Sequence, residues 1–151
     1  MLKKILLFII LVVFNSACDY TPVHIANENN FKIKIIGATG NDEINGYIIK
    51  ELERKSKNSS DEVGIEINTS FSKRILAKNT KSLATDYEIK IVGNFKLNKG
   101  EKLKSFTISE KFRYKNINNN YEQDNYESML KRNLSKTIVN KLNLRIKNLK
   151  W

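Results

Sequence analysis

Apolar and polar residues alternate in four segments of the chain, which is the pattern of strands that bury one face. The four segments are residues 31–35, 65–75, 87–97 and 106–114. Residues 98–100, Asn-Lys-Gly, are typical of a tight turn and predict a hairpin between the last two strands. Leu103 has the wrong parity for the apolar face of the last strand, so we expect a bulge near Lys104 or Ser105.

Two further segments have helical spacing. The first follows Asn41, a residue type that caps helices, and two acidic residues then suit the positive end of the helix dipole. This helix is expected to fade near Lys57. The second begins near Tyr121, and its apolar residues recur every four positions over residues 126–142.

The order of these elements is β-α-β-β-β-α and predicts an α+β fold of two layers. We expect a four-stranded, mostly antiparallel sheet with both helices on one face, and an antiparallel meander of the last three strands. No linker divides residues 31–151, which predicts a single domain. The opposite face of the sheet, rich in Lys, Asn and Ser, is left to water or to a partner.

The N-terminus has the three-part layout of a bacterial export signal: two lysines, ten apolar residues, and small residues before a cysteine. The apolar run is about half the ~20 residues that a membrane-spanning helix needs. Cys18 is the only cysteine, so no internal disulfide can form. We therefore predict a lipoprotein signal peptide (1–17), lipidation of Cys18 and a tether (18–30). The alternative is a buried segment followed by an idle thiol.

The charge of the exported chain is strongly positive. Removing Lys3 and Lys4 from the 27 Lys and Arg leaves 25 against 16 Asp and Glu, a net charge of +9. Such a balance favours an anionic partner, and export excludes nucleic acid, which leaves phospholipid headgroups or a phosphorylated glycolipid. The alternative is compositional bias, because the chain has 22 Lys against 5 Arg and is crowded with Ile and Asn.

Catalytic residues are lacking in the sequence. His24 is the only histidine and Cys18 is assigned to the lipid, so no Ser/His/Asp or Cys/His set can be assembled. A metal site has little support, because His24 has no second histidine and no cysteine partner. No glycine-rich phosphate loop is present. We predict a protein that is not an enzyme, with no metal and no cofactor.

One basic segment does suggest binding. Residues 72–81 are predicted as a hairpin loop that carries four cations beside the apolar pair Ile75 and Leu76. The four cations are Lys73, Arg74, Lys78 and Lys81. Cations next to apolar side chains suit an amphiphile with phosphates and acyl chains, such as lipopolysaccharide. An ordinary solvated turn is the alternative.

These features together resemble the LPS-assembly lipoprotein family (LptE), in particular its alphaproteobacterial branch. In that branch the lipidated cysteine opens a segment of the type Cys-Gly-aromatic-x-Pro-Leu-Tyr, and residues 18–24 here are Cys-Asp-Tyr-Thr-Pro-Val-His. Cys18, Tyr20, Pro22 and Val23 fit this pattern, whereas Asp19 and His24 depart from it. Residues 84–97 are similar to the family's central strand, and the order of elements also agrees.

The resemblance implies a non-enzymatic lipoprotein, anchored on the periplasmic side of the outer membrane. Its family acts in the lipopolysaccharide translocon as a plug and assembly partner of a large β-barrel (LptD-like) and can contact lipopolysaccharide. Asp19 allows inner-membrane retention, because in enteric bacteria an acidic residue after the lipidated cysteine has that effect. The alternatives are an auxiliary lipoprotein of an ABC-type phospholipid transport system and a structural or adhesive surface lipoprotein.

Overall fold

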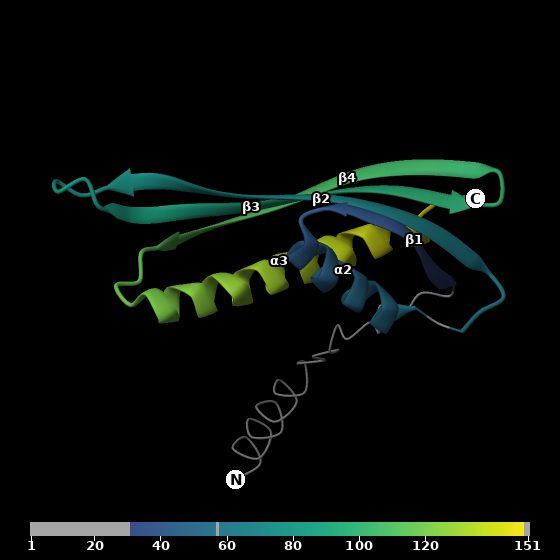
Figure 1. Ribbon diagram of the computed structural model, residues 1–151. Helices are drawn as coiled ribbons and strands as arrows, with labels where there is room; N and C mark the ends of the chain where they lie inside the picture. The colour runs from purple at the N-terminus through teal and green to yellow at the C-terminus, as the bar shows by residue number, and fades with distance from the viewer. Residues whose placement is uncertain (1–30, 57, 150–151) are drawn as a thin grey trace, which may run out of the picture.

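Four strands form one sheet in chain order, and two helices pack on it (Figure 1). The computed structural model describes residues 31–56 and 58–149, so the predicted signal peptide, Cys18 and the tether lie outside the described residues. The elements are β1 (Lys32–Gly40), α2 (Asp42–Lys55), β2 (Glu62–Lys78), β3 (Ala84–Lys99), β4 (Lys102–Lys115) and α3 (Asn120–Lys147). This order confirms the predicted α+β succession.

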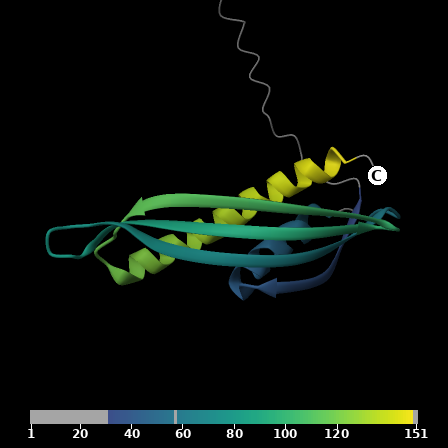
Figure 2. The same ribbon diagram turned by 90° about the horizontal axis from the view of Figure 1, so that it is seen from above.

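The sheet is mixed. β1 pairs with β2 in parallel, and α2 makes the crossover between them, whereas β2, β3 and β4 form the predicted antiparallel meander. Both helices lie on the same face of the sheet, and α3 crosses it diagonally (Figure 2). The β2–β3 hairpin extends beyond the N-terminal end of α3, so its tip stands clear of the helices (Figure 1).

The core lies between the helices and the sheet. Ile44 of α2, Ile65 of β2, Ile91 of β3 and Ile138 of α3 are fully buried there, and each such side chain contributes about 1.5–3 kcal/mol by leaving water. All four belong to the apolar periodicities of the sequence. The pattern therefore placed these buried faces correctly, although Ile75 and Phe112, which continue the apolar alternation of β2 and β4, are 50% and 42% exposed.

Both helices start at asparagine caps, of which the sequence analysis predicted Asn41. Asn41 accepts a hydrogen bond from the backbone N–H of Ile44 at 3.0 Å, and Asn119 caps α3 in the same way. α2 ends at Lys55 because Ser56 is already extended. The Ser56 hydroxyl accepts a hydrogen bond from the N–H of Ile33 at 2.8 Å, so the end of α2 is held by β1.

The predicted bulge near Lys104 or Ser105 is wrong. The β3–β4 register runs without a shift along the whole ladder, and Leu103 lies opposite Asn98 on the face away from the helices. Leu103 is 72% exposed, so its parity reflects an apolar residue that faces solvent rather than an extra residue in the strand.

The predicted hairpin loop at residues 72–81 is also too long. β2 continues to Lys78, and only residues 79–83 form the turn before β3. Cross-strand hydrogen bonding extends the strand past the point where its apolar alternation ends, with irregular register after Ile75.

None of the described helices combines the length and apolar character needed to cross a membrane.

Candidate functional site

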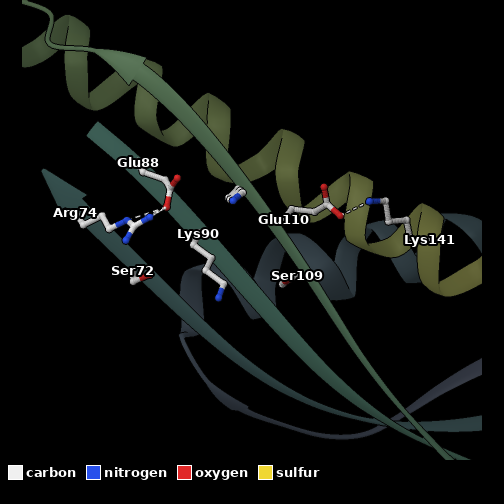
Figure 3. A pocket seen from close by; sticks show the side chains of 8 residues that line it. Ser72, Arg74, Glu88, Lys90, Ser109, Glu110 and Lys141 are labelled. Atoms are coloured by element: carbon white, nitrogen blue, oxygen red, sulfur yellow. Dashed lines mark hydrogen bonds and ion pairs between the residues drawn. The ribbon is translucent and has the colours of Figure 1, made fainter. Parts of the chain in front are cut away.

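The face of the sheet opposite the helices is uncovered, and we call it the open face. A hollow of about 530 Å³ lies on it across β2, β3 and β4 (Figure 3). Its lining residues are Ser72, Arg74, Glu88, Lys90, Ser109, Glu110, Lys111 and Lys141. All eight are polar or charged, which makes the hollow a surface for a polar or anionic group.

Glu88 lies at one end of the hollow between two arginines. Its oxygens accept hydrogen bonds from Arg74 Nε at 2.8 Å and Arg113 Nε at 2.9 Å, one from each neighbouring strand. The hydrogen bond from Arg113, followed by that from Arg74, holds the pKa of Glu88 below its usual value although burial opposes this. The Glu88 carboxylate is therefore charged and already occupied on both oxygens.

The next positions along the hollow form a row across the three strands. Ser72 lies opposite Lys90, and Lys90 lies opposite Lys111. Figure 3 shows Lys90 on β3 between the strands that carry Ser72 and Ser109. At the β4 edge of the hollow, Lys141 of α3 forms an ion pair with Glu110 at 2.5 Å.

Other rows of the open face are hydrogen-bonded internally. Asn68 donates to the hydroxyl of Thr39 at 2.8 Å, and Thr107 donates to the amide oxygen of Asn94 at 2.8 Å. Amides and hydroxyls of this kind can also bond to a second surface. The open face can therefore contact a polar partner over much of its length.

The four predicted lipopolysaccharide-binding residues do not form one cluster. Lys73 and Arg74 are neighbours in β2 and point to opposite faces of the sheet, as strand geometry requires. Lys73 pairs with Glu127 of α3 on the helix side, whereas Arg74 pairs with Glu88 on the open face. Lys78 ends β2, and Lys81 lies in the turn.

The hairpin tip keeps the combination of cations and apolar side chains that the sequence suggested. Ile75, Leu76 and Leu83 are 50%, 38% and 62% exposed there. The side-chain oxygen of Asn79 accepts hydrogen bonds from the backbone N–H groups of Lys81 and Leu83, which fixes the turn. The tip is thus an ordered, exposed and amphiphilic element.

Glu127 is a buried charged residue that sequence reasoning missed. Its Oε1 accepts hydrogen bonds from Lys73 Nζ at 2.5 Å, Tyr114 Oη at 2.6 Å and Gln123 Nε2 at 3.0 Å. Burial raises the pKa of Glu127, but these donors outweigh it and leave the pKa below its usual value. A signal was present, because Glu127 continues the buried stripe of α3 toward its N-terminus.

The described residues contain no group of three or more His, Cys, Asp or Glu side chains that could hold a metal ion. Two features of the described structure remain as binding surfaces: the open face with its hollow, and the hairpin tip. Both suit contact with another molecule through hydrogen bonds and charge.

The sequence matches no protein-family model and none of the curated proteins. The fold is nevertheless similar to solved lipoprotein structures. Rare lipoprotein B from Shewanella oneidensis superposes with a TM-score of 0.54 at 13% identity, over 76% of this chain and 98% of that one. Lipoprotein B from Nitrosomonas europaea gives a TM-score of 0.51 at 15% identity, over 80% and 84%.

A lipoprotein from Caulobacter crescentus gives a TM-score of 0.50 at 10% identity, over 76% of this chain and 86% of that one. All three are lipoproteins by name, and the shared fold is consistent with the resemblance stated from the sequence.

Proposed function

We propose that this chain is a lipid-anchored subunit of the outer-membrane lipopolysaccharide translocon, a plug and assembly partner of a large β-barrel. The observation that carries the proposal is the fold, which matches nearly the whole of rare lipoprotein B. The predicted signal peptide before Cys18 supports the anchor, and the residues that fit the family motif follow it. Acylation of Cys18 would keep the domain at a membrane surface.

The open face supports the contact with the barrel. The lumen wall of a membrane β-barrel is polar, so a plug needs a polar, hydrogen-bonding surface rather than an apolar one. The rows that contain Asn68, Asn94 and Thr107 provide such groups on a rigid sheet. We expect this face to lie against the wall of the barrel.

The hairpin tip supports a contact with lipopolysaccharide. Lys78 and Lys81 can meet phosphates while the exposed Ile75, Leu76 and Leu83 meet acyl chains. Lys73 and Arg74 play a different part in this proposal, because their ion pairs fix β2 in the sheet and so aim the tip.

Co-purification tests the proposed function. The full lipoprotein, solubilised from membranes with a C-terminal tag, is expected to bring down a large outer-membrane β-barrel, identified by mass spectrometry. Recovery of an inner-membrane ABC transporter without the barrel would assign the chain to phospholipid transport and reject the proposal.

A charge reversal tests the lipopolysaccharide contact separately. The Lys78→Glu/Lys81→Glu variant of the full lipoprotein is expected to lose most binding of purified lipopolysaccharide at low ionic strength, because charge-assisted contacts weaken with each lost cation. The matched control is Lys50→Glu/Lys136→Glu, which changes the charge equally on the helix layer. Equal binding by both variants would exclude the tip as the contact.

A further inference from the structure

We propose that the hollow on the open face binds a carboxylate side chain of the partner protein, held between Lys90 and Lys111. The proposal rests on the proposed function, because it names the chemistry by which the open face recognises the barrel. Its basis is a pair of like charges that the fold places side by side and leaves without a counter-ion among the described residues.

Lys90 and Lys111 are directly opposite each other on β3 and β4. Directly opposed side chains have Cβ atoms about 4.5–5.5 Å apart, and like charges at that spacing destabilise a sheet. Within the part of the chain that the structure describes, neither ammonium has an ion pair or a hydrogen bond. The repulsion is therefore not relieved inside the domain.

Several other lysines of the strands meet a carboxylate of a neighbouring strand or loop. The pairs are Lys34 with Glu62 at 3.4 Å, Lys96 with Glu66 at 3.8 Å and Lys99 with Asp61 at 2.7 Å. Compositional bias toward lysine explains how many lysines the chain has. It does not explain why these two are placed opposite each other while the nearby carboxylates pair with other cations.

The acidic residues of the hollow cannot serve as the missing partner. Both oxygens of Glu88 are bound by Arg74 and Arg113, and Glu110 is bound by Lys141 across the β4 edge. The lining carries four cations against these two carboxylates. An anion from another molecule would supply the counter-ion that Lys90 and Lys111 lack.

The hollow is open to solvent on the open face, so a side chain of another protein can enter it. Ser72 and Ser109 are small, so space remains beside the lysines, and their hydroxyls can donate to a carboxylate. No lining residue is apolar, so the hollow offers no apolar side chain to an acyl chain. This difference from the hairpin tip is why we assign a protein carboxylate here rather than a lipid phosphate.

Zero-length cross-linking tests this contact, because a carbodiimide joins an amine only to a carboxylate that touches it. The full lipoprotein is cross-linked while bound to the barrel, and the peptides are identified by mass spectrometry. We expect links from Lys90 or Lys111 to an Asp or Glu of the barrel. Links to the barrel from other lysines, with none from these two, would overturn the inference and leave the proposed function standing.

A charge reversal measures the strength of the contact. Lys90→Glu/Lys111→Glu should lower barrel recovery at least about tenfold, since removing a buried charged partner costs several kcal/mol. Lys50→Glu/Lys136→Glu, with the same charge change in the groove between α2 and α3, should leave recovery unchanged. Equal losses in both variants would mean that net charge alone matters and would overturn the inference. The inference would also be overturned if Lys90→Glu/Lys111→Glu lost lipopolysaccharide binding but kept full barrel recovery.

A third variant separates binding from folding. Lys90→Gln/Lys111→Gln removes the repulsion, so the free lipoprotein should melt at the same temperature as the wild type or higher, while barrel recovery falls. A lower melting temperature would show that the two lysines stabilise the domain, which contradicts the inference. Failure of the wild type to recover any barrel would instead reject the proposed function.

Discussion

Glu127→Ala should destabilise the domain through the hydrogen bonds that it removes. Glu127 joins α3 to β2 through Lys73 and to β4 through Tyr114, and its side chain is only 11% exposed. The substitution leaves the buried Tyr114 hydroxyl without its acceptor, which costs about 1–3 kcal/mol. The Lys73 side chain is 32% exposed and regains water, so the lost ion pair adds at most about 1 kcal/mol.

The total expected loss is about 1–4 kcal/mol in the free energy of unfolding, measured by urea denaturation. Glu53→Ala is the matched control, because Glu53 is exposed on α2, and it should change stability by less than about 0.5 kcal/mol. Tyr114→Phe should destabilise the wild type but have almost no effect in the Glu127→Ala background. If Glu127→Ala and Glu53→Ala unfold at the same urea concentration, the buried cluster does not hold α3 to the sheet.

The same cluster gives a pH dependence. The folded pKa of Glu127 lies below its usual value, so the folded state favours the charged form. The contribution to stability is therefore complete above the unfolded pKa of about 4.3 and is lost as the pH falls through the lower folded value. Glu127→Gln should unfold with a weaker acid dependence than the wild type below about pH 4.5.

The remaining predictions concern the glycines, the core and the anchor. Gly40→Ala should cost about 2 kcal/mol or more, because φ is +96° and a Cβ would lie 1.9 Å from the carbonyl oxygen of Thr69; Gly46→Ala, with nothing within 4 Å, should be neutral or stabilising in the same thermal melts. Leu134→Asp should destabilise by about 3–5 kcal/mol through a buried unpaired charge; an unshifted melt would mean that the inner face of α3 is misplaced. Mass spectrometry of the membrane-bound protein should find acyl chains on Cys18, and an unmodified N-terminus at Asp19 or later would reject the lipid anchor.

Local periodicity determined much of this fold from the sequence alone. The alternation in three long strands and the four-residue spacing of α3 specify which side chains avoid water, and each pattern depends only on nearby residues. The buried Ile65, Ile91 and Ile138 confirm those faces. The predicted Asn41 cap is equally local, since it reaches only three residues along the chain.

Only the tertiary structure decided which charges meet. Lys73 and Arg74 are adjacent in sequence, yet the pleat sends them to opposite faces, to Glu127 and Glu88. The end of β2 was also beyond local reasoning, because hydrogen bonds to β3 extend it to Lys78 where apolar alternation has stopped. Lys90 and Lys111 became neighbours through the β3–β4 register, which is set by the whole hairpin. Charges interact through space, so their partners follow from strand pairing and not from their spacing along the chain.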